Sequence, residues 1–76
     1  MTLVEIEYCV PCGFLNRAED LQHVLLQTFG EQLEAVTLRT GDHGIFEVRV
    51  DGETVFDKSE DEFDVDEITR NVKEKL

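Results

Sequence analysis

The segment from Tyr8 to Phe14, which reads Tyr-Cys-Val-Pro-Cys-Gly-Phe, contains both cysteines and the only proline of this 76-residue chain. Before it, apolar residues alternate with Glu5 and Glu7, which is the pattern of a strand with one wet face. After it, apolar residues recur at helical spacing. The segment is therefore expected to be a tight turn between a strand and a helix, with two thiols at the turn.

The two cysteines, Cys9 and Cys12, have the spacing of a redox-active dithiol. A Cys-x-x-Cys pair where a strand meets a helix is typical of thioredoxin-like redox sites. We expect both residues on the first helical turn, with Pro11 at the helix start, where its missing N–H needs no partner. The unpaired N–H groups and partial positive charge of that terminus favour a thiolate and lower the pKa of a cysteine. The sequence thus predicts Cys9 and Cys12 as the catalytic pair.

The first half of the chain predicts a strand, a helix and a strand. The strand is expected at residues 3–8, the helix at about 11–29 with Gly30 as its C-terminal cap, and the second strand at 35–40. This order favours a right-handed crossover between two parallel strands.

The second half predicts a hairpin and a final helix. Apolar runs at residues 45–50 and 53–57 flank Asp51-Gly52, and Asp-Gly between such runs is a strong hairpin signal. Asp64 and Glu67 form a variant of the capping box, and apolar residues follow at helical spacing up to Leu76. The expected order of elements is βαβββα.

The register of the hairpin predicts which strand residues face the core. A two-residue loop would place Val48 and Val55 on the core face, and Phe56 with Glu47 and Arg49 on the opposite face. A sheet with one mostly polar face is covered by helices on one side only. We therefore predict a two-layer α/β (α+β) fold in which a four-stranded mixed sheet carries both helices on one face.

This pattern resembles the thioredoxin-like Rdx family, which includes selenoproteins W, T and H. Two stretches carry the resemblance: the cysteine-containing turn at residues 8–14, and the stretch from Gly44 to Gly52, which is similar to the family's Gly-x-Phe-Glu-Val segment and hairpin turn. Members often have Phe-Pro before the last helix, where this chain has Phe63 and Asp64. The resemblance covers nearly the whole chain, as one domain over residues 1–76. It implies a thioredoxin-like fold and a thiol oxidoreductase linked to glutathione or thioredoxin systems.

Two analogies disagree about the attacking cysteine. In selenoprotein members the second position of the pair is selenocysteine, which corresponds to Cys12, whereas thioredoxins attack with the first cysteine, which corresponds to Cys9. Helix electrostatics does not decide, because the terminal field reaches both sulfurs. A residue just before a helix is more open than one inside its first turn, so we predict that Cys9 attacks and Cys12 resolves. Protein or low-molecular-weight thiols and disulfides are the expected partners, and no cofactor is expected.

The net charge of −11, from eighteen acidic and seven basic residues, limits the possible partners. Nucleic acids and anionic membranes need a basic face, so neither is expected as a partner. Only three lysines accompany the eighteen acids, which favours adaptation to high salt, where self-repulsion is screened. The N-terminal residues lack the basic and apolar regions of a signal peptide, so a cytoplasmic location is expected.

Other readings of the same residues lead to different functions. The two cysteines could be buried structural thiols, or they could bind zinc together with His23 and His43. Arg17 could support a thiolate, although a solvated arginine is the simpler interpretation. The rival to an oxidoreductase is a non-enzymatic protein, either an acidic binding module or a thiol carrier for a metal. The reduction potential of the cysteine pair distinguishes these classes.

Overall fold

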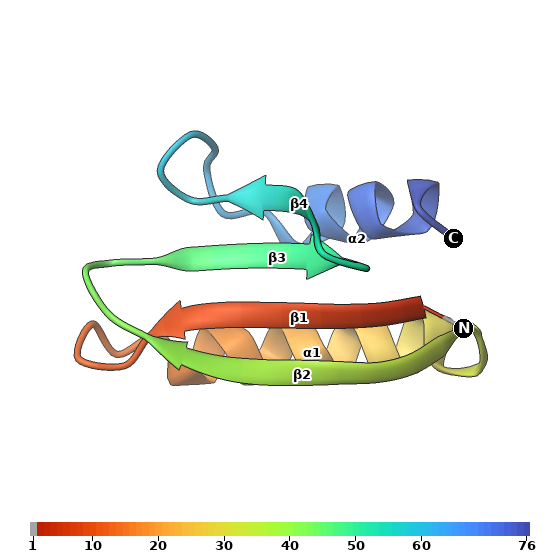
Figure 1. Cartoon of the computed structure of the whole chain (residues 1–76), viewed down its shortest axis with the longest axis horizontal. Coiled ribbons are helices and arrows are strands. Elements are labelled where there is room, and N and C mark those ends of the chain that lie inside the picture. Colours follow the sequence, from red (N-terminus) through yellow and green to blue (C-terminus); the bar gives the residue numbers. More distant parts are fainter. Residues whose placement is uncertain (1) are drawn as a thin grey trace.

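The computed structural model describes residues 2–76 and has the element order βαβββα that the sequence predicts (Figure 1). A short 3₁₀ helix is added after the first helix, and the strands extend by one or two residues beyond several predicted ends. The elements are β1 (Thr2–Cys9), α1 (Leu15–Phe29), the 3₁₀ helix (Gly30–Gln32), β2 (Leu33–Gly41), β3 (Phe46–Val50), β4 (Glu53–Asp57) and α2 (Val65–Glu74).

The four strands form one mixed sheet in the order β2-β1-β3-β4. Strand β1 is parallel to β2 and antiparallel to β3, and β3 pairs with β4 in an antiparallel hairpin. The predicted parallel crossover and mixed sheet are confirmed, and the fold is thioredoxin-like. Because β1 is paired on both sides, its carboxyl end, Cys9, is held by the middle of the sheet.

Both helices cover the same face of this sheet, as predicted (Figure 1). Helix α1 buries Ala18, Leu21 and Leu25 completely, and their spacing places them on one stripe of the helix. Helix α2 adds Ile68 and Val72, which are also fully buried in the same core. Two layers are therefore enough to enclose a single core. None of the helices within residues 2–76 has the length and apolarity needed to cross a bilayer.

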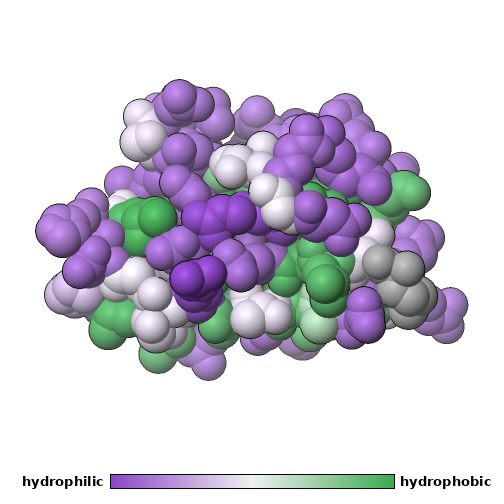
Figure 2. Space-filling model, in the orientation of Figure 1, coloured by the Kyte–Doolittle hydropathy of each residue, from purple (hydrophilic) through white to green (hydrophobic). Residues whose placement is uncertain are grey.

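The uncovered face of the sheet is polar, also as predicted, and Figure 2 shows it as mostly hydrophilic. Arg49 lies among three carboxylates there, with its Nη1 2.6 Å from Glu5 and its Nη2 2.8 Å from Glu7, and it also contacts Glu47. The hydrogen bond to Glu7 is the main cause that raises the pKa of Arg49, against the opposing effect of burial. One guanidinium thus offsets part of the negative charge of this face.

The prediction for Phe56 was wrong. Strand β3 pairs Arg49 with Thr54 but Val48 with Phe56, so one extra residue of β4, Val55, is accommodated in a bulge. A bulge of one residue moves the following side chains to the other face. Phe56 is therefore buried in the core at 3% exposure, where it contacts the Phe46 ring.

The predicted helix ends also need correction. Helix α1 ends at Phe29 with Gly30 in the C-cap position, as predicted, but Gly30 has helical φ and ψ angles and begins the 3₁₀ helix instead of adopting the left-handed conformation. Helix α2 ends at Glu74, which leaves Leu76 beyond the helix and 42% exposed. The predicted start of α2 is confirmed for Asp64, whose side chain caps the helix, but among the described residues the Glu67 side chain makes no return bond to the N–H of Asp64.

Candidate functional site

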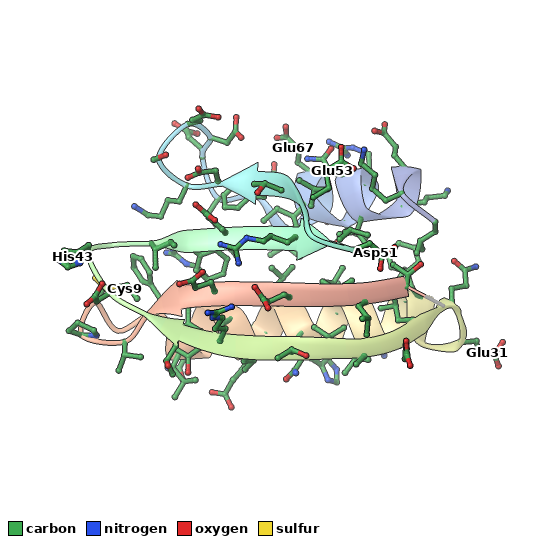
Figure 3. All side chains as sticks on the ribbon, viewed as in Figure 1. Cys9, Glu31, His43, Asp51, Glu53 and Glu67 are labelled. Carbon is green, nitrogen blue, oxygen red and sulfur yellow. A yellow bond between two sulfur atoms is a disulfide. The ribbon has the colours of Figure 1, made fainter. Side chains whose placement is uncertain are left out.

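The first cysteine of the pair, Cys9, is the last residue of β1 and is fully buried. Its N–H donates a hydrogen bond to the carbonyl of Ile45 (2.8 Å), and its own carbonyl accepts one from the N–H of Phe14 (3.4 Å). Figure 3 labels Cys9 and His43 at the same end of the molecule, far from Glu31. Cys9 is thus fixed by the sheet and by the loop before β3.

Cys12 lies in a turn and not on the helix, which corrects the prediction that both cysteines belong to the first helical turn. The N–H of Gly13 donates to the carbonyl of Val10 (3.1 Å), and helix α1 begins only at Leu15. Gly13 has a φ of 77°, in the left-handed region that glycine adopts readily and that interrupts a helix. The cysteines therefore precede the helix.

The structure joins Cys9 and Cys12 in a disulfide, with their Cα atoms 5.3 Å apart. The two residues differ in access to solvent: Cys9 has 0% exposure, whereas Cys12 is exposed. This reverses the expected accessibility, which was the reason for naming Cys9 as the attacking residue. Cys9 is the last residue of a central strand, and backbone hydrogen bonds join it to Ile45 and Phe14, whereas Cys12 lies in the turn.

The start of α1 lies directly after the turn that holds Cys12. No side chain caps this helix, and its first turn contains no acidic residue. The N–H of Ala18 donates to the carbonyl of Phe14 (3.0 Å) and closes the first helical turn. The preceding N–H groups have no partner within the helix, so they present positive partial charge near the turn.

Arg17 lies against two aromatic rings beside the turn. Its Cζ is 5.1 Å from the centre of the Phe14 ring and 4.6 Å from that of Phe63, so it is half-buried and not simply solvated. Lys58 approaches the Phe14 ring as well, with its Nζ 5.4 Å from the ring centre. These contacts hold two cations at the same end of the molecule as Cys12.

A groove of about 500 Å³ runs between the turn, the first turns of α1 and the segment before α2. Cys12 and Arg17 belong to its wall. The sequence pointed to both of these residues, but it marked Phe63 only as a position before the last helix and gave no sign that this distant residue lines the groove. The residues that line the groove include Cys12, Phe14, Asn16, Arg17, Asp20 and Phe63.

The histidines do not join the cysteines in a metal site. The side chain of His43 is 88% exposed, and its Nδ1 lies 2.6 Å from Oδ1 of Asp42. His23 is exposed on α1. Among residues 2–76, no three or more His, Cys, Asp or Glu side chains gather in a way that could hold a metal ion.

Comparison with known proteins agrees with this geometry. A sequence model of the Rdx family matches residues 3–74. A crystal structure of a Bordetella parapertussis protein is similar with a TM-score of 0.92 and 28% identity, over 99% of this chain and 98% of that chain. A selenoprotein W-related protein from Vibrio cholerae is similar with a TM-score of 0.90 and 26% identity, over 97% and 95% of the two chains. No curated protein matched the chain. These similarities support a redox-type function of the thioredoxin-like kind.

Proposed function

This chain belongs to the Rdx family, and on that premise we propose that it is a small thiol–disulfide oxidoreductase in which Cys12 attacks and Cys9 resolves. The observation that carries the proposal is the difference in access: Cys12 is exposed in the wall of a groove, whereas Cys9 is fully buried and does not line the groove. A substrate sulfur can approach Cys12 from solvent, whereas it cannot reach Cys9. This assignment agrees with the selenocysteine position of the family and not with the thioredoxin analogy.

The reaction follows from thiol–disulfide exchange. In the reduced protein, the Cys12 thiolate attacks one sulfur of a substrate disulfide, which forms a mixed disulfide and releases the first substrate thiolate. The Cys9 thiolate then attacks Sγ of Cys12, which forms the Cys9–Cys12 disulfide and releases the second thiolate. The released thiolates take up protons from water. The substrate gains two electrons, and a solvent-borne thiol or dithiol returns the protein to its reduced form.

The surroundings of Cys12 suit a thiolate. The uncapped start of α1 follows the turn, and Arg17 and Lys58 add positive charge at the same end of the fold. Positive charge and a helix N-terminus both stabilise a thiolate relative to a thiol. Proteins or low-molecular-weight compounds with a disulfide are the proposed substrates.

Trapping of the mixed disulfide tests the roles of the two cysteines. Reduced Cys9→Ser and Cys12→Ser variants are mixed with bis(2-hydroxyethyl) disulfide, and the adducts are measured by intact mass. We expect Cys9→Ser to accumulate an adduct on Cys12, and Cys12→Ser to form little. An adduct only in Cys12→Ser would restore Cys9 as the attacking residue. If neither variant forms an adduct while both remain folded by circular dichroism, the oxidoreductase function itself is contradicted.

Alkylation of the wild-type protein provides a second measurement that does not depend on a substitution in the core. With a limiting amount of iodoacetamide, the reduced protein should be labelled first on Cys12, because Cys9 is buried. Peptide mapping then identifies the labelled residue. Faster labelling of Cys9 would contradict the proposed roles.

A further inference from the structure

We propose that the groove beside Cys12 selects small disulfides that carry a carboxylate, and that Arg17 is the residue that binds this carboxylate. The inference rests on the proposed function, because it concerns the substrate of the same dithiol. The groove has a volume of about 500 Å³, which falls in the range of small-molecule sites. The groove places an arginine in the same wall as the exposed cysteine.

Arg17 belongs to the same groove wall as Cys12. Arg17 is in the first turn of α1, and helical side chains lean toward the N-terminus of their helix. The contact with the Phe14 ring confirms this direction, since Phe14 precedes the helix. Stacking on Phe14 and Phe63 fixes the planar group, so less conformational freedom is lost when it binds a carboxylate.

Arg17 forms no ion pair with another described residue. Arg39, Arg49 and Lys75 each form an ion pair with a glutamate. In the part of the chain that the structure describes, Arg17 forms none, although the chain carries eighteen acidic residues. A half-buried arginine that lacks a carboxylate partner in so acidic a protein is well placed to take one from a ligand.

One acidic residue shares the groove and limits where the anion binds. Asp20 lies about one turn further along α1 than Arg17, away from the Cys12 end. A carboxylate is therefore attracted near Cys12 and repelled deeper along the helix. This arrangement favours a ligand whose carboxylate is only a few bonds from its sulfur.

Three disulfides of similar size test the inference. They are 3,3′-dithiodipropionate, which carries carboxylates, bis(2-hydroxyethyl) disulfide, which is neutral, and cystamine, which carries ammonium groups. The second-order rate constant for oxidation of the reduced protein is measured with each, by acid quench and intact mass, at equal ionic strength. Since the net charge of −11 repels anions, a faster reaction with the dicarboxylate than with the neutral compound indicates a local attraction.

The variants are Arg17→Met, which keeps a long apolar stem, and Arg70→Met as the matched control. Arg70 is exposed on α2, and its substitution changes the net charge by the same amount. We expect the dicarboxylate-to-neutral rate ratio to fall about tenfold in Arg17→Met, as the loss of a hydrogen bond to a charged group implies. The ratio should stay unchanged in Arg70→Met.

The outcomes separate the two proposals. If no disulfide oxidises the wild-type protein, the proposed function fails. If all three react but the wild-type protein does not prefer the dicarboxylate, or Arg17→Met leaves the ratio unchanged, only the carboxylate site is overturned. An equal fall of the dicarboxylate and neutral rates in Arg17→Met also overturns it, because Arg17 would then act only on the cysteine.

Discussion

The two helices of this protein begin in opposite ways. The Asp64 side chain caps α2 by accepting hydrogen bonds from the N–H groups of Asp66 (3.0 Å) and Glu67 (3.3 Å), and both of these residues add acidic charge to the first turn. Helix α1 has neither a capping side chain nor an acidic residue at its start. The chain has eighteen acidic residues, so acids are abundant elsewhere, yet none lies in the first turn beside Cys12.

The two helix starts therefore differ in the stabilising groups that they carry. A side-chain cap contributes about 1 kcal/mol, and a carboxylate in the first turn adds a few tenths. Helix α2 has both contributions, and its start shows no reactive group. Helix α1 has neither contribution, so no side chain offsets the positive field of its first N–H groups, which lie next to the turn that holds Cys12. With the proposed role of Cys12, a carboxylate at the start of α1 would oppose formation of the thiolate.

Salt acts on all the charges at once, so it should have the largest effect. Acidic residues crowd the segment before α2, from Glu60 to Glu62, and continue into its first turn. The screening length falls from about 10 Å at about 0.1 M to about 3 Å at about 1 M salt. We expect the melting temperature, measured by circular dichroism, to rise steeply over this range of KCl. A flat response would contradict adaptation to high salt.

Removing the cap of α2 should have the next largest effect. Asp64→Ala leaves the N–H groups of Asp66 and Glu67 without their acceptor, so the free energy of unfolding should fall by about 1 kcal/mol. Asp64→Asn is the matched control, because asparagine caps almost as well as aspartate. Urea unfolding measures both variants. Equal stability of Asp64→Ala and the wild-type protein would show that the cap contributes nothing.

Moving a carboxylate from the start of α2 to the start of α1 should directly test how the two helix starts differ in stability and in reactivity. Asn16→Asp places an acid in the first turn of α1, which should stabilise the helix by about 0.5 kcal/mol and slow attack on a neutral disulfide roughly twofold. Asp66→Asn should lower stability by a similar amount without changing the rate. Stability is measured by urea unfolding, and the rate by acid quench.

The double variant Asn16→Asp/Asp66→Asn keeps the net charge at −11 and separates a local effect from a global one. Its stability should be close to that of the wild-type protein, and its rate should match that of Asn16→Asp alone. A wild-type rate in the double variant would mean that overall charge, and not the start of α1, controls the reaction.

The smallest effect is expected at Asp57, which ends β4 on the approach to α2. The pKa of Asp57 is lowered mainly by a hydrogen bond from the Ser59 hydroxyl, whose Oγ lies 2.7 Å from Oδ1 of Asp57. A second hydrogen bond, from the N–H of Ser59, lowers the pKa further. Because the folded pKa lies below the unfolded one, this stabilisation is present above the ordinary Asp pKa and is lost as the pH falls through the folded value. Ser59→Ala should raise the pKa of Asp57 toward its ordinary value in a carboxylate NMR titration. An unchanged pKa would show that the hydroxyl has no role.

Several features of the fold could be predicted because they depend on local patterns. Alternation predicted the strands, helical spacing predicted both helices, and Asp51-Gly52 predicted the hairpin, whose turn has positive φ at both residues. Asp64 was identified as a cap because capping depends on residues only a few positions away. The core face of Phe56 was missed, because a one-residue bulge is a response to packing and reverses the alternation beyond it.

The sequence by itself determined that Cys9 and Cys12 lie where a strand ends and a helix follows, at a spacing that permits a disulfide. Only the tertiary structure decided which of them is open to solvent, because the burial of Cys9 depends on the strands and loops that surround β1. It also decided that Arg17 lies against Phe63, a contact between distant parts of the chain. Periodicity and capping are set by neighbours within a few residues, whereas exposure and long-range stacking are set by how the elements pack.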